Sequence, residues 1–219
     1  MTGIRFRNPE VRMSAALAGA EAALPDPVVS LRELLAALGE QGLLVFCGVL
    51  AAPFLLPVTV PGMSTVLGAP MLLIGFAVML SRVPWLPERL LNHSLSAVTV
   101  RAVLAKVRGW AERFEHLVRP RWLGLTGGRA VNAVNGALVI LSVLLLMAPI
   151  PLVPLVNSIP ALAVLLLCFG MAERDGLVIV IGYFTTMIAT VYVGGLIFLL
   201  FYVGLRHEQA LEQLKLWYN

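Results

Sequence analysis

The sequence predicts an all-α integral membrane protein: a helical bundle with two inverted re-entrant or broken hairpins, plus amphipathic helices at the membrane surface. Hydrophobic residues make up 59% of the 219 residues and charged residues only 13%, against about 25% charged in a typical soluble domain. Three stretches contain no Asp, Glu, Lys or Arg, and two of them carry a proline-rich break: residues 41–81, 131–172 and 176–205. Each stretch exceeds the roughly 20 residues that cross a bilayer.

Other classes fit poorly. A soluble domain of this size could not hide three such stretches from water, and the alternation of apolar and polar residues typical of a membrane β-barrel is absent. Cys47 and Cys168 lie within apolar runs and are expected to be small buried hydrophobic residues. No metal-ligand cluster, nucleophile elbow or phosphate loop is found. We therefore expect no enzyme activity, no cofactor and no metal, with membrane lipids rather than nucleic acid as partners.

The amino-terminal residues 1–27 are predicted to form a mobile tail, because they are poor in large apolar side chains and end in turn-forming residues. Ser30 and Glu33 then form a capping-box pattern. The pattern predicts a short amphipathic helix at the membrane surface that ends near Gly39 or Gly42. Residues 28–205 are expected to form one membrane domain.

The first hairpin covers about residues 30–82. Its middle contains Pro57, Pro61 and Pro70 together with two glycines and three hydroxyl residues, which should prevent one continuous helix. Only eleven residues lie between Pro70 and Arg82. This length predicts a re-entrant half helix rather than a full crossing.

The segment of residues 83–129 is predicted to be cytoplasmic. From Arg82 to Arg129 there are nine Lys or Arg residues and three Glu residues. Residues 96–117 alternate apolar and basic side chains as a helix lying on an anionic leaflet would. By the positive-inside rule this loop, and with it the amino terminus, faces the cytoplasm.

The second hairpin, at about residues 130–175, repeats the order of the first. A crossing at residues 131–147 is followed by a proline-rich break at 148–160, a short helix at 161–172 and an arginine at 174. The alignment needs a gap of about two residues, and chance resemblance between apolar segments is the alternative explanation. The final segment, 176–205, is long for one crossing and short for two. The tail at 206–219 is expected to be a short helix returning to the membrane surface.

Several motifs in this order resemble the ExoD family of bacterial inner-membrane proteins over residues 30–205. They are Pro57-Val58-Thr59-Val60-Pro61-Gly62, Ser64, Gly68-Ala69-Pro70, Pro84-Trp85-Leu86-Pro87, Asn157-Ser158-Ile159-Pro160-Ala161 and Glu173-Arg174-Asp175-Gly176. The resemblance implies a multi-pass protein of the inner membrane that affects exopolysaccharide production, without catalytic residues to transfer. A more distant likeness of architecture is to DedA-type proteins, which are associated with moving polyprenyl phosphate or phospholipid.

If the two breaks meet at the centre of the bundle, the helix amino termini that follow them would attract an anion. Paired broken segments of this kind indicate a binding site in transporters built from repeats. The candidate substrate-binding residues are Ser64, Arg82, Asn157, Ser158 and Arg174, and the candidate proton-coupling residues are Glu173 and Asp175. Each has a structural alternative: compact turns for the hydroxyl and amide residues, topology-setting arginines, and carboxylates that cap the next helix.

These features favour a transporter-like protein that moves an anionic, lipid-linked phosphate by alternating access, as a homo-oligomer with a dimer favoured. A non-transporting assembly factor for polysaccharide synthesis, acting through its basic helix, is the second hypothesis. An exchanger of small ions or protons is the third.

Overall fold

The computed structural model describes residues 13–25, 27–56, 62–81, 94–114, 120–150, 153 and 155–218. Apart from two strands of three residues each, the regular structure in these ranges is helical, which confirms the predicted all-α class. The elements are α1 (Met13–Ala23), β1 (Val28–Ser30), α2 (Leu31–Ala51), η1 (Ala52–Leu55), α3 (Met63–Leu80), β2 (Ser94–Ser96), α5 (Ala97–Phe114), η2 (Leu123–Leu125), α6 (Arg129–Leu146), α7 (Ser158–Ala172) and α8 (Gly176–Tyr218).

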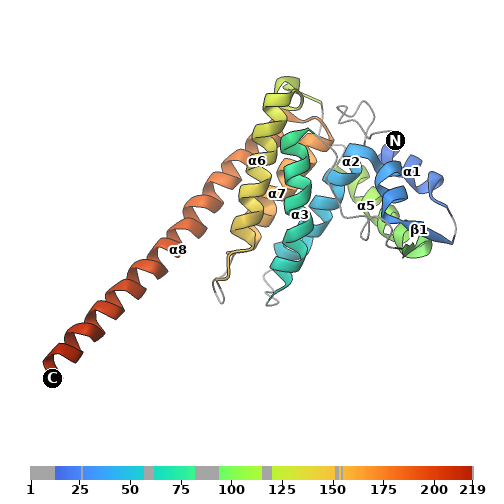
Figure 1. Ribbon diagram of the computed structural model, residues 1–219. Coiled ribbons are helices and arrows are strands. Elements are labelled where there is room, and N and C mark those ends of the chain that lie inside the picture. Colours follow the sequence, from blue (N-terminus) through green and yellow to red (C-terminus); the bar gives the residue numbers. More distant parts are fainter. Residues whose placement is uncertain are drawn as a thin grey trace.

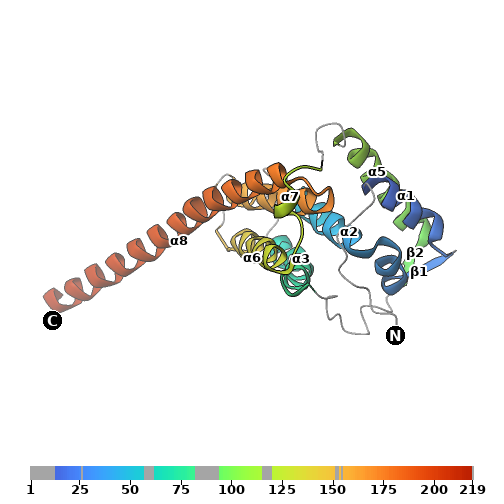
Figure 2. The same cartoon turned by 90° about the horizontal axis from the view of Figure 1, so that it is seen from above.

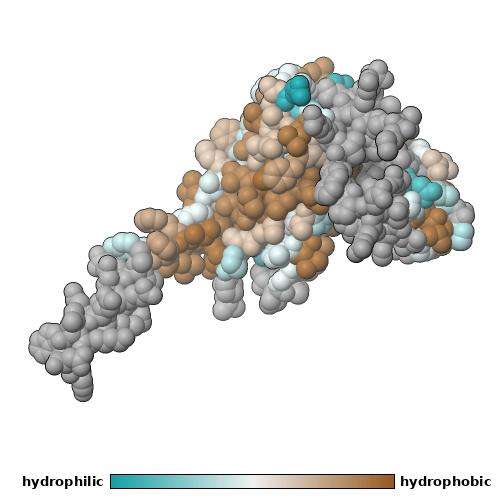
Figure 3. All heavy atoms as spheres, viewed as in Figure 1, coloured by the Kyte–Doolittle hydropathy of each residue, from teal (hydrophilic) through white to brown (hydrophobic). Residues whose placement is uncertain are grey.

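Three helices are long and apolar enough to cross a membrane: α3, α6 and the segment Gly176–Val203 of α8. The 18 residues of α3 or α6 rise about 27 Å, close to the roughly 30 Å of hydrocarbon in a bilayer. Shorter apolar helical segments occur at Gly42–Leu55 and Ser158–Ala172. Apolar side chains gather over the middle of this bundle, with hydrophilic groups at its upper end (Figure 3). The length and composition of these helices are compatible with a membrane protein.

Helix α3 runs through Pro70 without a break, so the predicted half helix that begins after this proline is wrong. Proline removes one intrahelical hydrogen bond, a cost that tertiary packing can offset. Here α3 packs closely along α6, where a Cβ atom on Gly136 would collide with the backbone of Met79. Pro160, in contrast, lies in the first turn of α7, where its missing N–H has no intrahelical partner to lose.

The end of η1 and the start of α3 lie at the same end of the bundle as the end of α6 and the start of α7 (Figure 1). Gly68, near the start of α3, lies against Met147, just after α6. Helix α2 packs against α7, and η1, which follows α2, also contacts α7. The α2–α3 and α6–α7 hairpins therefore point in the same direction. The predicted inverted pair is not seen among the described residues, which do not include Pro57 and Pro61 of the first break or Pro151 and Pro154 of the second.

Helix α8 continues without interruption for 43 residues. The segment at 176–205 is therefore part of a single helix, and the predicted separate tail helix is the continuation of α8. Its first turns pack antiparallel against α7, and its distal part leaves the bundle (Figure 2). From Ile197 to Val203 every residue is exposed and large apolar residues dominate. A helix that is apolar on all sides is suited to lipid.

Outside the bundle, α1 and α5 lie side by side, and β1 pairs antiparallel with β2 with Val29 opposite Leu95 (Figures 1 and 2). Leu17 of α1 and Leu104 of α5 are buried in the core. The predicted amphipathic helix at 96–117 is confirmed as α5, but it packs on α1. The prediction of a mobile tail is wrong for residues 13–23. This alanine-rich segment forms α1, which packs on α5 and buries Leu17.

The predicted capping box is confirmed at the start of α2. The Glu33 amide donates to Ser30 Oγ at 3.2 Å, and the Ser30 amide donates to Glu33 Oε2 at 2.8 Å. The predicted end of this helix near Gly39 or Gly42 is wrong, since α2 continues to Ala51. Two glycines lower helix propensity by about 1 kcal/mol each, which burial of the following apolar turns offsets.

Candidate functional site

The chain makes a tight corner between α7 and α8. The amide of Asp175 donates to Gly170 O at 2.9 Å and the amide of Arg174 donates to Met171 O at 3.4 Å, the two bonds of a Schellman motif. In this motif the residue at the position of Arg174 is left-handed and is usually glycine. Arg174 adopts φ 56°, a conformation that costs a residue with a side chain about 1–2 kcal/mol.

Asp175 links this corner to the start of α8 and to Arg121. Its side chain is fully buried, and Oδ1 accepts hydrogen bonds from the amides of Leu177 at 2.9 Å and Val178 at 3.4 Å. These bonds cap the amino terminus of α8. Arg121 donates its Nε–H to both carboxylate oxygens at 2.9 Å. The hydrogen bond and the negative charge of Asp175 raise the pKa of Arg121, so Arg121 stays protonated.

Residues 120–128, which we call the strap, cross this corner. The Arg121 amide donates to Arg174 O at 3.4 Å, and the Gly176 amide donates to Arg121 O at 2.8 Å. A Cβ atom on Gly176 would collide with Trp122, so the strap and α8 touch only because residue 176 is glycine. At its far end the strap is held by Asn135 of α6, whose Nδ2 donates to Leu125 O at 3.2 Å.

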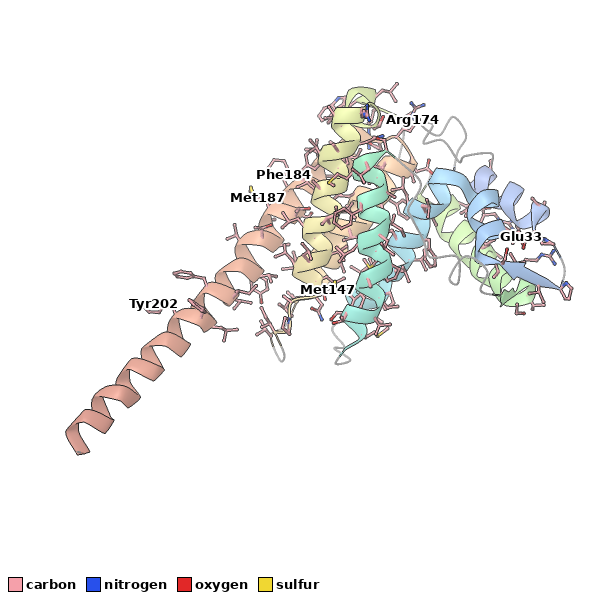
Figure 4. The ribbon with its side chains drawn as sticks, viewed as in Figure 1. Glu33, Met147, Arg174, Phe184, Met187 and Tyr202 are labelled. Carbon is pink, nitrogen blue, oxygen red and sulfur yellow. The ribbon has the colours of Figure 1, made fainter. Side chains whose placement is uncertain are left out.

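The side chain of Arg174 lies at this end of the bundle (Figure 4). Its Nε atom is buried and has no hydrogen-bond partner among the residues that the structure describes. A buried donor without an acceptor costs about 1–3 kcal/mol, and more for a charged group. The neighbouring carboxylate of Asp175 is already bonded to Arg121 and to the α8 amides. The corner therefore contains a guanidinium group whose Nε–H has no acceptor, and an anion would supply one.

The structure separates the predicted site residues into two groups. Ser64 lies in the first turn of α3, and Asn157 and Ser158 lie at the start of α7, at the end of the bundle that carries both turns. The others, Glu173, Arg174 and Asp175, follow the opposite end of α7. The 15 residues of α7 separate the two groups by about 22 Å. Arg82 lies outside the described residues.

Neither group forms the single central site that the sequence predicted. Asn157 makes no side-chain cap to α7, and Glu173 is 7% exposed at the α7 terminus. The charged group at the strap is the stronger candidate, because it combines an ion pair, a buried carboxylate and an unpaired guanidinium nitrogen.

A set of buried polar contacts between α6 and α8 was not predicted from the sequence. Tyr183 donates to Asn135 Oδ1 at 2.6 Å, and the hydroxyls of Ser142 and Thr186 lie 3.1 Å apart, both fully buried. Asn135 and Ser142 are seven residues apart and so lie on one helix face. This spacing of polar residues in an apolar helix is the pattern in the sequence that could have indicated the contacts. Arg121 was missed because nothing in the sequence links it to Asp175, 54 positions away.

Among the described residues, no group of three or more His, Cys, Asp or Glu side chains could hold a metal ion. Cys47 and Cys168 are buried, free thiols.

Comparisons with known proteins agree on one family. The family model described as "Exopolysaccharide synthesis, ExoD" matches residues 13–195. Protein ExoD of Rhizobium meliloti (strain 1021) is 40% identical over 189 residues, which cover 86% of this chain and 79% of that protein. An uncharacterised protein of Synechocystis sp. (strain ATCC 27184 / PCC 6803 / Kazusa) is 26% identical over 192 residues, covering 87% of this chain and 88% of the relative. No solved structure matches significantly. The chain belongs to the ExoD family of proteins related to exopolysaccharide synthesis.

Proposed function

We propose that this protein handles an anionic, lipid-linked phosphate during exopolysaccharide synthesis, and that Arg174 binds the phosphate. The observation that carries the proposal is the buried Nε of Arg174, which lacks an acceptor among the described residues. A phosphate oxygen would satisfy this donor, and the planar guanidinium group can bind phosphate through two parallel hydrogen bonds.

The left-handed backbone of Arg174 supports the same proposal. A glycine at this position would relieve the strain that φ 56° imposes. Strain of this kind gathers at binding sites, where an arrangement is kept for function rather than for stability. The Schellman motif and the strap would then hold the Arg174 side chain in one orientation.

The two acidic neighbours receive different roles in this proposal. Asp175 is fully engaged by Arg121 and the α8 amides, so it positions the corner and keeps its own charge compensated. Glu173 is buried at the end of α7 and is the candidate for proton coupling, because burial changes how readily an ionisable group is protonated.

We place the corner at the headgroup level of the cytoplasmic leaflet of the bacterial inner membrane. Trp122 and Leu123 of the strap are 61% and 55% exposed, as suits residues that insert among lipid headgroups. Arg121 and Arg129 are exposed at the same end and follow the positive-inside rule. In a homodimer that works by alternating access, Ser64, Asn157 and Ser158 would contact the substrate at the opposite side.

Binding of polyprenyl phosphate to the full-length protein in phosphatidylcholine nanodiscs tests the proposal. Arg174→Ala should weaken binding at least tenfold, because a charge-assisted hydrogen bond contributes about 1.5–3 kcal/mol. Arg174→Lys should restore part of it. Arg129→Ala, which removes an exposed arginine at the same end, is the matched control and should change little. Unchanged binding by the Arg174→Ala protein would remove this residue from the function.

A non-transporting assembly factor is the second candidate function. It is favoured by the packed α1–α5 pair, which lies outside the candidate membrane spans and could hold a synthase. Movement of polyprenyl phosphate across reconstituted vesicles separates the two: transport requires movement that depends on Arg174, whereas an assembly factor gives none.

A further inference from the structure

Asn135 is a fully buried polar side chain of α6, with 0% of its surface exposed. Both ends of its amide group are used: Oδ1 accepts from the hydroxyl of Tyr183 at 2.6 Å, and Nδ2 donates to Leu125 O at 3.2 Å. The reverse orientation of the amide would place Oδ1 against the carbonyl oxygen of Leu125, which is also an acceptor. The two contacts therefore require each other.

These two contacts join different parts of the molecule. Tyr183 belongs to α8 and Leu125 belongs to the strap, so the side chain of Asn135 connects α8 to the strap. A second connection between the same two parts lies at the corner, where the Gly176 amide donates to Arg121 O at 2.8 Å. The strap is thus bound at the first turn of α8, and again through a residue that lies about 10 Å further along this helix.

The strap is compact between these two attachments. The Leu125 amide donates to Trp122 O at 2.9 Å, and the Thr126 amide donates to Leu123 O at 3.1 Å. The Thr126 hydroxyl, which is buried, also donates to Leu123 O at 3.0 Å. These bonds form one continuous turn, so a displacement of Leu125 also displaces Arg121 instead of being absorbed by a loose loop.

We propose that Asn135 and Tyr183 are positioning residues for the phosphate site at Arg174. They hold the strap against the corner from inside the bundle, and the strap contacts the backbone of Arg174 through the Arg121 amide, which donates to Arg174 O at 3.4 Å. The inference rests on the function proposed for Arg174 and makes that site dependent on the packing of α6 against α8. Buried hydrogen-bond partners behind a binding group keep its orientation.

A second buried hydrogen bond between α6 and α8 provides a matched control. The hydroxyl oxygens of Ser142 and Thr186 lie 3.1 Å apart, and both side chains are buried. Thr186 donates its proton to Gly182 O at 2.9 Å, so Ser142 is the donor within the pair. In the part of the chain that the structure describes, neither hydroxyl is hydrogen-bonded to the strap. Ser142→Ala therefore weakens the same helix interface without touching the strap.

Hydrogen exchange of the full-length protein in phosphatidylcholine nanodiscs measures how firmly the strap is held, without any ligand. Tyr183→Phe removes one hydroxyl and keeps the ring, and Asn135→Leu removes both contacts at nearly constant volume. Each change should speed exchange of the Arg121 and Gly176 amides, which join the strap to the corner, at least threefold. Ser142→Ala should leave these amides at the parent rate, although its unfolding temperature falls.

Binding of polyprenyl phosphate in the same nanodiscs measures the consequence for the site. Tyr183→Phe and Asn135→Leu should each weaken binding three- to tenfold, and Ser142→Ala should not weaken it. Because the two residues act through one chain of contacts, the double variant should bind as strongly as Asn135→Leu alone. Effects that multiply in the double variant would contradict the shared chain of contacts.

The positioning role is overturned if neither Tyr183→Phe nor Asn135→Leu speeds exchange at the strap, or if faster exchange leaves binding unchanged. It is also overturned if Ser142→Ala speeds exchange as much as Tyr183→Phe, since the strap would then report only a looser bundle. Tyr183→Phe alone decides the outcome where Asn135→Leu fails to fold.

Failure of the positioning role can be distinguished from failure of the proposed function. If only the positioning role is wrong, Arg174→Ala still weakens binding of polyprenyl phosphate, while Tyr183→Phe does not. If the proposed function is wrong, Arg174→Ala leaves binding unchanged. The exchange measurement involves no ligand, so it reports whether Asn135 and Tyr183 hold the strap in either case.

Discussion

Arg174 carries two energetic costs that a structural residue would avoid. Its backbone is left-handed at φ 56° and its buried Nε lacks an acceptor in the described chain. Ser81 at the end of α3 has a similar backbone, with φ 49°, but its hydroxyl lies 3.4 Å from Asn132 Nδ2. Left-handed backbone also occurs at Trp122 and Leu155, and among these described positions only Arg174 contains an unsatisfied cationic donor.

Arg174→Gly should raise the free energy of unfolding by about 1 kcal/mol, because glycine adopts the left-handed conformation without the penalty of a Cβ atom. The same change should abolish binding of polyprenyl phosphate. Thermal unfolding in detergent and the nanodisc binding assay measure the two effects. A gain in stability together with a loss of function would mark the arginine as kept for binding.

Two further variants complete this test. Ser81→Gly should give a smaller gain in stability with binding retained, since it relieves the same strain but removes the hydroxyl that accepts from Asn132 Nδ2. Arg174→Ala should give a smaller gain than Arg174→Gly, because alanine removes the unpaired donor but keeps the backbone strain. An Arg174→Gly protein that is less stable than the parent would show that the Arg174 side chain itself contributes to packing.

At the scale of the elements, local signals in the sequence predicted the identity of most helices but not their limits. The Ser30–Glu33 capping box and the amphipathic pattern of α5 are confirmed. Pro70 and Gly42 indicated helix ends, yet α3 and α2 pass through them. Propensity acts over a few residues with about 1–3 kcal/mol, whereas burial of whole helix faces is collective and depends on partners that the local sequence does not reveal.

The capping box makes the start of α2 sensitive to acid. The hydrogen bonds from Ser30 lower the pKa of Glu33, so the carboxylate stabilises the folded state while it is ionised. This contribution is complete above the unfolded value of about 4.3 and is lost as the pH falls through the lowered folded value. Stability curves from pH 6 to pH 3 should therefore converge for the parent and Glu33→Gln proteins.

Ser30→Ala is the companion variant in this titration. It removes the serine oxygen that accepts from the Glu33 amide, and should lower stability by about 1 kcal/mol over the whole range. Parallel curves for the parent and Glu33→Gln proteins, with no convergence at low pH, would mean that the Glu33 carboxylate does not support the cap.

For the whole molecule, the repeat in the sequence predicted two similar hairpins, but the inverted arrangement that we expected for them is not seen in the described residues. Similar order of apolar and proline-rich segments is compatible with parallel or inverted copies, because hydropathy alone carries no direction. The arrangement is determined by contacts between distant residues, such as Gly136 against Met79 and Gly68 against Met147. For the same reason, the sequence did not reveal the Arg121–Asp175 pair or the strap that lies against Arg174.

The parallel arrangement predicts that both turns face the same side of the membrane. Thr65→Cys near the first turn and Leu155→Cys in the second, both at exposed positions, should react with an impermeant thiol reagent from one side of oriented vesicles. Ala130→Cys, exposed at the start of α6, should react only from the other side. The native Cys47 and Cys168 are buried and should stay unlabelled, which the parent protein checks. Labelling of the two turns from opposite sides would instead support inverted hairpins and contradict this fold.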